Sequence, residues 1–197
     1  MSKVAIQGDS SGSGTFTIAS PNSNSNYTLT LPANTGTILT TASDGQAIPK
    51  AALPTGSVLQ VVHATHSTEV SNGVQDQEYF VYQATITPLF STSKLLAIAT
   101  VGGIDNASSG RMSGRIRWNT TSGGTSGTEI AGLTQVAQNT GGTTGLSAMA
   151  MSGLSAAVGS TSTAYVKVTM THGDAGGTTY VCRYGSQSQL LVMEIAA

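Results

Sequence analysis

Apolar and polar residues alternate along most of the chain after residue 56. The alternation is sharpest in residues 111–119, where Met112, Ile116 and Trp118 share one face and a row of arginines lies on the other. A period of two is typical of a strand with one buried face, and no apolar stripe with the helical period of 3.6 appears. We therefore predict essentially no helix. The predicted strands cover residues 58–65, 79–87, 94–101, 111–119, 129–133, 146–153, 164–171, 179–184 and 189–195.

The predicted strands are short and are separated by loops rich in glycine, serine and threonine. Eight or nine strands of this kind predict an all-β fold, a jelly-roll-like β-sandwich formed by residues 57–197. The apolar face predicted for the second strand consists of Phe80, Tyr82, Ala84 and Ile86. Residues 94–101 are apolar almost throughout, which predicts a central strand covered on both faces.

The first 40 residues also alternate between apolar and polar positions, but in shorter runs with fewer apolar residues. Alternating runs occur at residues 14–19, 26–31 and 36–40, and residues 4–6 are a fourth candidate. Each run has only a few apolar positions on one face, and strands this thin cannot bury a core alone. We expect them to need a partner surface, either the sandwich or copies of this chain, which favours an oligomer. The predicted organisation is an N-terminal β-repeat or attachment segment (1–42), a proline-containing linker (43–56) and a head domain (57–197).

Composition excludes several classes of protein. Only 9% of the 197 residues are charged, and eight Lys and Arg against nine Asp and Glu give a net charge of −1. Nucleic-acid binding requires a basic surface, so we expect none. No apolar run reaches the ~18 residues of a membrane span and no signal peptide is recognisable, so we expect no membrane insertion and synthesis in the cytoplasm. Cys182 is the only cysteine, which excludes an intrachain disulfide and favours a packed position in the core.

Residues with catalytic or metal-binding chemistry are few. His63 and His66 are three positions apart at a strand end and so face opposite sides, and we expect them to form no metal site with His172. Asp76 and Glu78 are two positions apart on a possible strand, and glycoside hydrolysis requires such a pair of carboxylates. No further motif supports them. We therefore expect a protein without catalytic activity, metal or cofactor.

Several passages resemble bacteriophage tail-fibre proteins. Residues 14–41, with the runs GTFTI and YTLTLPANTGTILTT, are similar to a fibre-shaft repeat. Residues 53–62 (LPTGSVLQVV) are similar to the junction that opens many small fibre heads, and residues 191–196 (LVMEIA) to the final strand of such heads. The segments ITP at residues 86–88 and SKLL at residues 93–96 fit a second and third head strand. The similarity spans most of the chain.

The resemblance implies a homotrimeric virion protein located in the tail. Residues 1–42 would attach to other proteins of the tail or baseplate, and the head would bind the host cell surface, with a glycan as the expected receptor. Two alternatives remain open. One is a capsid decoration or head-fibre protein, and the other is a compact tailspike that degrades a glycan.

The candidate receptor-binding residues lie in or near the predicted loops. Loops at residues 102–110, 120–127, 138–145 and 172–177 offer hydroxyls, amides and backbone donors, the groups that bind a neutral sugar. The polar residues that we single out are Asp105, Asn106, Asp174 and Tyr184. Ordinary turn chemistry explains the same loops.

A row of arginines on one strand is a second candidate contact surface. The row consists of Arg111, Arg115 and Arg117. It would suit an acidic glycan such as the phosphate of lipopolysaccharide. The alternative is that Asp76, Glu78 or Glu129 on neighbouring strands pairs with these arginines, at ~0–1 kcal/mol per surface pair. Trp118 offers a ring for sugar stacking, but the alternation assigns it to the core face.

Overall fold

The structure, a computed structural model, describes residues 11–13, 17, 22–26, 28, 53–106, 111–138, 146–173 and 177–197. The chain divides into two units, Met1–Thr40 and Thr41–Ala197. The strands predicted before residue 41 lie wholly or largely outside the described residues, as does most of the predicted linker. The boundaries 1–42, 43–56 and 57–197 therefore stay predictions.

Ten strands make up most of the described part of the second unit. They are β1 (Val58–His66), β2 (Val70–Asn72), β3 (Glu78–Ile86), β4 (Lys94–Asn106), β5 (Arg111–Asn119), β6 (Thr128–Gln138), β7 (Ser147–Leu154), β8 (Ala164–His172), β9 (Thr179–Val181) and β10 (Ser188–Ile195). A single 3-10 turn, η2 (Arg183–Gly185), is the helical element among the described residues. No helix in that part of the chain is long and apolar enough to cross a membrane.

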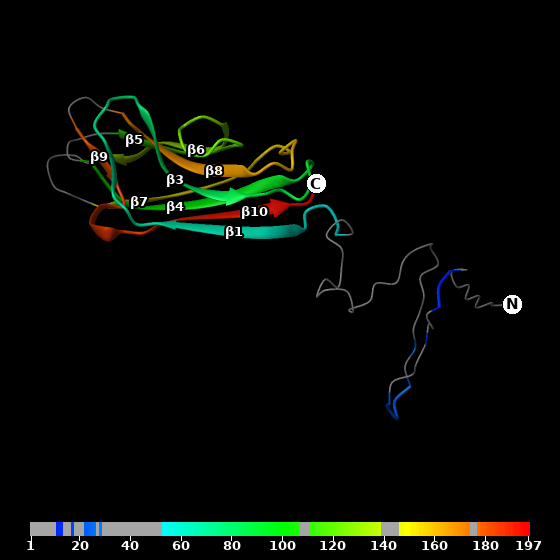
Figure 1. The fold of residues 1–197 in the computed structure, drawn as a ribbon. Coiled ribbons are helices and arrows are strands. Elements are labelled where there is room, and N and C mark those ends of the chain that lie inside the picture. The colour runs from blue at the N-terminus through cyan, green and yellow to red at the C-terminus, as the bar shows by residue number, and fades with distance from the viewer. Residues whose placement is uncertain are drawn as a thin grey trace. The chain divides into compact units, whose positions relative to one another are not determined.

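The strands form two antiparallel sheets (Figure 1). The six-stranded sheet has the order β1-β10-β4-β9-β2, with β7 also paired to β4, and the four-stranded sheet has the order β3-β8-β5-β6. In Figure 1, β1, β10 and β4 lie beneath β5, β6 and β8, so the two sheets are layers of a sandwich. The predicted all-β, jelly-roll-like sandwich is confirmed.

The core fills the space between the inner faces of the two sheets. Alternate residues of β4 from Leu95 to Val101 are fully buried. Each large apolar side chain buried there contributes ~1.5–3 kcal/mol relative to leaving it in water. A Cβ on Gly114 of β5 would lie 2.5 Å from the Cε of Met149, so the methionines of β7 occupy the space above this glycine. Cys182 is also fully buried, as its sequence context predicts.

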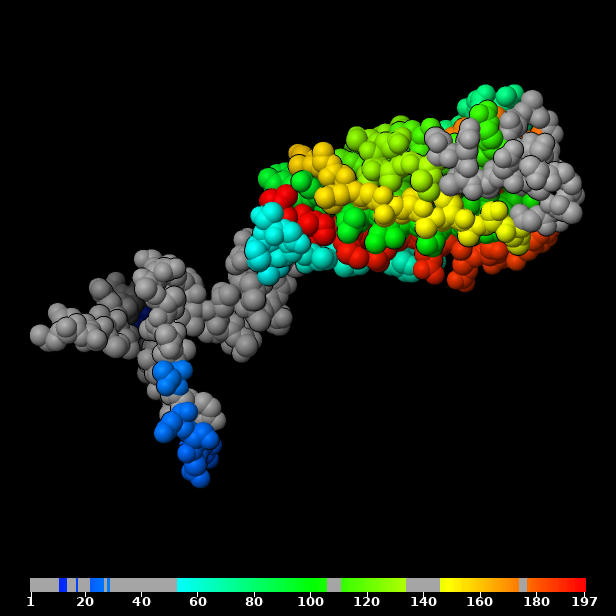
Figure 2. Space-filling view, turned by 180° about the vertical axis from the view of Figure 1, so that it is seen from behind, coloured from blue at the N-terminus to red at the C-terminus, as the bar shows by residue number. Residues whose placement is uncertain are grey.

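Strands of different sheets meet along the two long edges of the sandwich. β1 lies beside β3 on one edge, and β6 lies beside β7 on the other. Figure 2 shows the second edge, where the yellow β7 runs along the light green β6. A Cβ on Gly153 of β7 would lie only 2.4 Å from the backbone oxygen of Ile130 in β6. Glycine at position 153 therefore allows this edge to close.

The chain enters and leaves the sandwich at the same end. The Gly56 N–H donates to the oxygen of Ala196 at 2.7 Å, and the Ala196 N–H donates to the oxygen of Ser57 at 2.9 Å. From this connection end β1 runs to the far end, where β9 and the orange-red η2 lie (Figure 1). One end of the sandwich therefore holds the chain connection at Gly56 and Ala196, and the far end holds β9 and η2.

A bulge in β3 corrects the face predicted for the second strand. The register with β8 shifts between Phe80 and Tyr82, and Phe80 lies opposite Thr169, which belongs to the outward-facing polar row. Tyr82, Ala84 and Ile86 share the buried face, as predicted. The extra residue of a bulge reverses the alternation, which is why Phe80 does not join them.

Strand β4 corrects two further expectations. It is thirteen residues long and continues to Asn106, so residues 102–106 are strand rather than the beginning of a loop. Ile98 on its outer face is 38% exposed, so the described part of one chain covers β4 on one face only. The segment predicted as a strand over residues 179–184 also differs, because β9 ends at Val181 and η2 follows.

Candidate ligand-binding site at the far end of the sandwich

Two adjacent glycines of β4 allow a loop to lie against the strand at the far end. A Cβ on Gly102 would lie 2.5 Å from the backbone oxygen of Gln187, and a Cβ on Gly103 would lie 2.6 Å from the Cβ of Ser186. Gly103 also has a φ of +60°, which favours glycine. These glycines therefore fix the position of residues 182–187, which we call the far-end loop.

The far-end loop contains two residues in a strained backbone conformation. Cys182 and Tyr184 have φ values of 58° and 56°, in the left-handed region. This region costs a residue other than glycine ~1–2 kcal/mol. The Cys182 thiol is buried, with Sγ 3.0 Å from the Oγ of Ser188, whereas Tyr184 is 71% exposed. Such strain is concentrated at functional sites, and here it presents an aromatic ring to solvent.

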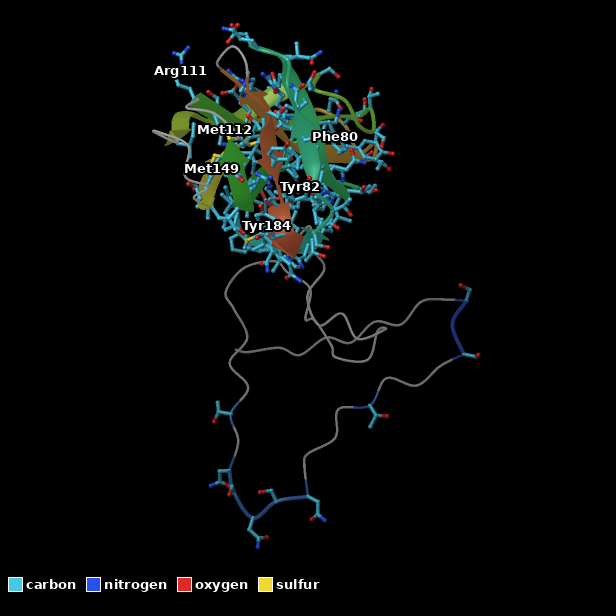
Figure 3. All side chains as sticks on the ribbon, turned by 90° about the vertical axis from the view of Figure 1, so that its left-hand side faces the viewer. Phe80, Tyr82, Arg111, Met112, Met149 and Tyr184 are labelled. Carbon is cyan, nitrogen blue, oxygen red and sulfur yellow. The ribbon has the colours of Figure 1, made fainter. Side chains whose placement is uncertain are left out.

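The guanidinium of Arg183 lies over two tyrosine rings. Its Cζ is 4.1 Å from the ring centroid of Tyr180 and 5.0 Å from that of Tyr184. Arg183 also donates a hydrogen bond from Nη1 to Asp105, which is 1% exposed. Desolvation opposes the charged form, but the hydrogen bond to Asp105, the charge of Asp105 and the two nearby tyrosines together outweigh it and raise the pKa of Arg183. The buried carboxylate thus fixes the arginine, and the arginine supports the exposed Tyr184 ring at the end that Figure 3 views.

The sequence singled out two residues of this site. Asp105 and Tyr184 both contact Arg183, because β4 pairs with β9 next to the far-end loop. Asp105 is buried within a strand rather than exposed in a loop, so it can orient Arg183 but cannot itself touch a receptor. Asn106 is the last residue of β4, and Asp174 lies outside the described residues.

Sequence reasoning missed Arg183 and Tyr180. Both fall in the segment predicted as one strand over residues 179–184, where positions three apart would face opposite sides. The turn after Val181 brings them to the same side. Gly185, which follows Tyr184 and has a φ of +75°, is the signal of a turn that the sequence does contain.

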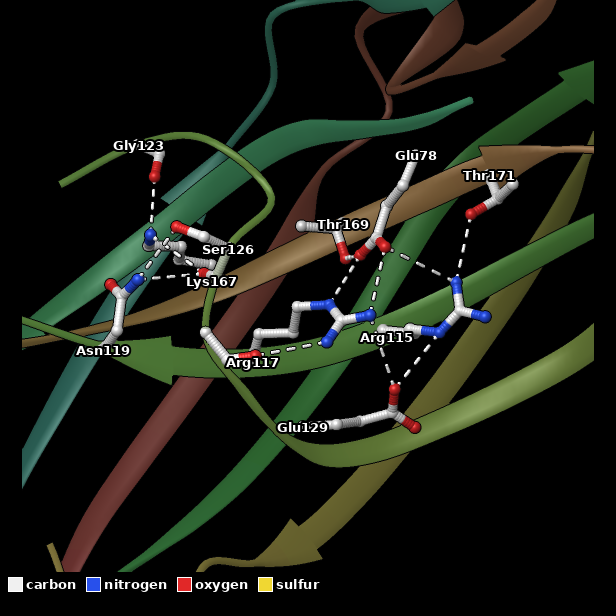
Figure 4. A network of polar contacts seen from close by, with 11 residues as sticks. Glu78, Arg115, Arg117, Asn119, Gly123, Ser126, Glu129, Lys167, Thr169 and Thr171 are labelled. Atoms are coloured by element: carbon white, nitrogen blue, oxygen red, sulfur yellow. Dashed lines mark hydrogen bonds and ion pairs between the residues drawn. The ribbon is translucent and has the colours of Figure 1, made fainter. Parts of the chain in front are cut away.

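Carboxylates engage Arg115 and Arg117 of β5 (Figure 4). Arg117 donates from Nε to Oε1 of Glu78 at 2.7 Å and from Nη2 to Oε2 at 3.1 Å. Arg115 Nε lies 3.2 Å from Oε2 of Glu129, which also lies 3.6 Å from Arg117 Nη2. The predicted pairing with Glu78 and Glu129 is confirmed, and it leaves these two arginines poorly suited to an acidic glycan.

Arg111 and Asp76 lie outside this network of four side chains. Arg111 is exposed and donates from Nη2 to the backbone oxygen of Gly173 at 3.3 Å. Asp76 lies in the turn before β3 with a φ of 54°, so it does not share a strand face with Glu78. The pair of carboxylates considered from the sequence is therefore not formed.

One predicted contact loop, residues 120–127, is fixed by polar groups beneath it. Lys167 of β8 is buried, and its Nζ donates to the backbone oxygens of Gly123 at 2.5 Å and Ser126 at 3.3 Å. Desolvation lowers the pKa of Lys167. The side chain of Gln83 accepts from the Gly123 N–H at 2.8 Å. These carbonyls are used within the fold rather than presented to a ligand.

The pKa of Glu78 provides a test of its pairing with Arg115 and Arg117. Burial alone would raise the pKa of Glu78, but hydrogen bonds from Arg117 and Thr169 and the positive charges of Arg117 and Arg115 together outweigh it and lower the pKa. A lowered pKa in the folded state means that the carboxylate stabilises the fold above its unfolded pKa of about 4.3 and loses this effect as pH falls through the folded value.

We expect Glu78→Gln to lower the free energy of unfolding by about 1–2 kcal/mol at pH 7, because two charge-assisted hydrogen bonds are lost in a partly solvated position. The difference from the native protein should shrink as pH falls below about 4. Urea unfolding at several pH values measures it. Glu129→Gln, at a side chain 45% exposed, is the matched control and should cost less. A Glu78→Gln effect that is the same at pH 7 and pH 3 would contradict this account.

The three histidines do not lie together, and Trp118 is not presented to solvent as a platform for a sugar. His63 is exposed on β1, His66 stacks on the Tyr82 ring at 5.5 Å, and the Nδ1 of His172 lies 2.7 Å from the hydroxyl of Thr179. No three His, Cys, Asp or Glu side chains gather as a metal site would need within the part of the chain that the structure describes. Trp118 packs against the core, as the alternation predicts.

Solved structures that are similar to this chain include capsid proteins of infectious bursal disease virus. The VP2 subviral particle of infectious bursal disease virus has a TM-score of 0.39 and 15% identity, over 70% of this chain and 38% of that chain. The T=1 particles derived from the same virus give a TM-score of 0.35 and 20% identity, over 70% of this chain and 36% of that chain. This chain thus spans little more than a third of the VP2 chains that it matches. No protein-family model and no curated protein matches the chain.

Proposed function

We propose that this chain is a virion structural protein of the tail-fibre type, which binds a glycan on the host cell surface without catalysis. The observation that carries the proposal is the exposed Tyr184 ring, supported by Arg183 in a strained loop at the far end of the sandwich. Residues 1–42 attach the protein to the tail or baseplate, and three copies form a homotrimer. The resemblance of the sequence to tail-fibre proteins supports both the attachment through residues 1–42 and the homotrimer.

The chemistry of the far end suits a sugar. An exposed tyrosine offers an apolar ring face and a polar hydroxyl, and a sugar has both kinds of surface. The positive charge of Arg183 is balanced by Asp105, so the described part of the site has no net charge. This balance favours a neutral sugar over an acidic one. The site lies at the end of the sandwich opposite the chain connection.

We expect Tyr184→Ala to weaken binding of the full chain to polysaccharide from a susceptible host about tenfold or more. Loss of an aromatic hot spot costs ~2 kcal/mol, and 1.4 kcal/mol corresponds to a factor of ten. Isothermal titration calorimetry measures the dissociation constant. Leu89→Ala is the matched control, because Leu89 is 39% exposed and lies at the connection end. Equal binding by the Tyr184→Ala variant and the native protein would refute the site.

Two further measurements test the rest of the proposal. Incubation of the protein with the same polysaccharide should release no reducing ends, and their release would indicate a glycan-degrading tailspike. Gold-labelled antibody on intact virions should mark the tail. Label spread over the capsid would instead indicate a decoration protein.

A further inference from the structure

The outer face of the six-stranded sheet is apolar across four neighbouring strands. Cross-strand register places Val61, Met193, Leu96 and Leu154 in one row over β1, β10, β4 and β7, and Leu191 and Ile98 in the next row. We call these six residues the apolar face. Val61 is 53% exposed, Ile98 38% and Leu154 51%, so this surface faces solvent in a single copy of the chain.

The outer face of the four-stranded sheet has the opposite character. It carries the network of Glu78, Arg115, Arg117 and Glu129, which Figure 4 shows. An antiparallel sheet that faces water normally alternates apolar inward and polar outward residues. The four-stranded sheet follows this rule and the six-stranded sheet does not. The difference between the two sheets indicates that the apolar face is covered in the working protein.

The lack of charge on the apolar face and its area favour another copy of this chain as the partner that covers it. The rows of the apolar face contain one ionisable side chain in the described structure, His63, which lies opposite Leu191. A surface without charges can meet a copy of itself with no repulsion and with no charge left buried. Four strands about 4.8 Å apart and two rows about 6.8 Å apart give about 260 Å² before side-chain relief is counted. This is about a third of the ~800 Å² that each partner buries in a stable interface, so the apolar face would form the centre of the contact, and the polar residues of the neighbouring rows would form its rim.

We propose that the apolar face is the surface through which copies of this chain associate, with three copies turning this face toward a common threefold axis. The inference rests on the homotrimer of the proposed function and locates its contact on β1, β10, β4 and β7. It is independent of the ligand at the far end.

The test places a charge in the centre of the face. Ile98→Lys in the full chain should raise the dissociation constant of the oligomer at least about 100-fold, because a lysine without a partner is costly to bury. Within one copy the lysine can extend into water. Val61→Lys on β1 is a second variant with the same expected effect. Thr85→Lys, at an exposed position of β3 in the other sheet, is the matched control and should leave the oligomer intact.

Sedimentation equilibrium over a range of protein concentrations gives the mass and the dissociation constant, and circular dichroism identifies any variant that fails to fold. An oligomeric native protein with monomeric Ile98→Lys and Val61→Lys variants is the expected result. A monomeric native protein overturns both this contact and the homotrimer. An oligomer that persists in both lysine variants overturns the contact and leaves the homotrimer standing.

Discussion

Glu194→Ala is expected to lower the free energy of unfolding by about 3 kcal/mol, the largest loss that we expect from one polar side chain. Glu194 is fully buried at the connection end. Its Oε1 accepts from the N–H groups of Leu89 at 2.8 Å and Phe90 at 3.3 Å, and its Oε2 accepts from Nε2 of Gln60 at 2.5 Å. Alanine would remove the acceptor from donors on two other segments and leave a cavity between them.

Urea unfolding followed by Trp118 fluorescence measures this loss, at one protein concentration because association shifts the apparent stability. Glu194→Gln keeps one acceptor oxygen and should cost less than Glu194→Ala. Glu69→Ala removes an exposed carboxylate and should change stability by less than about 0.5 kcal/mol. Similar values for Glu194→Ala and Glu69→Ala would show that the buried carboxylate does not hold this end together.

Gly103→Ala is expected to cost about 2–4 kcal/mol and to weaken ligand binding as well. Two effects add. The φ of +60° is unfavourable for alanine by ~1–2 kcal/mol. The new Cβ would also lie 2.6 Å from the Cβ of Ser186 and 2.7 Å from the backbone nitrogen of Arg183, and overpacking of this kind costs ~1–3 kcal/mol. The far-end loop must move to relieve it, and Arg183 would move with the loop.

Gly185→Ala separates the two effects. Gly185 lies in the same loop with a φ of +75°, but no heavy atom lies within 4 Å of its added Cβ. We expect a cost of about 1 kcal/mol from conformation alone. Urea unfolding and calorimetry with the polysaccharide measure both variants. If Gly103→Ala costs no more than Gly185→Ala, the close approach of the loop to β4 is not what requires glycine at position 103.

The strands could be predicted wherever the alternation was uninterrupted. Residues 111–119 were predicted with the bounds of β5 itself, because every second residue there is apolar or glycine. The alternation also gave the correct face for Arg115 and Arg117, and hence their carboxylate partners. It failed at Phe80, because a bulge is a local change of register that leaves no separate mark in the composition.

The candidate site was harder to predict, because a glycine can mark the start of a loop or can allow another segment to approach a strand closely. Gly102 and Gly103 were interpreted as the beginning of a loop, whereas the structure uses them for the close approach of another segment to a continuing strand. The same interpretation placed Asp105 on the surface. Its partner Arg183 lies 78 positions later in the chain, and only the pairing of β4 with β9 brings the two together. Periodicity describes neighbours along the chain and carries no information on such a contact.

The position of the chain connection has a mechanical consequence. If a bound cell pulls on Tyr184 while the virion holds the chain at Gly56, the force runs along the length of the sandwich from one end to the other. β1 begins at the connection end, and its partner β10 begins just after the far-end loop. The pull therefore loads these two antiparallel strands in shear, with their hydrogen bonds lying across the line of force. Bonds in this geometry share the load together instead of opening one after another, so the sandwich resists tension in the direction in which attachment would apply it.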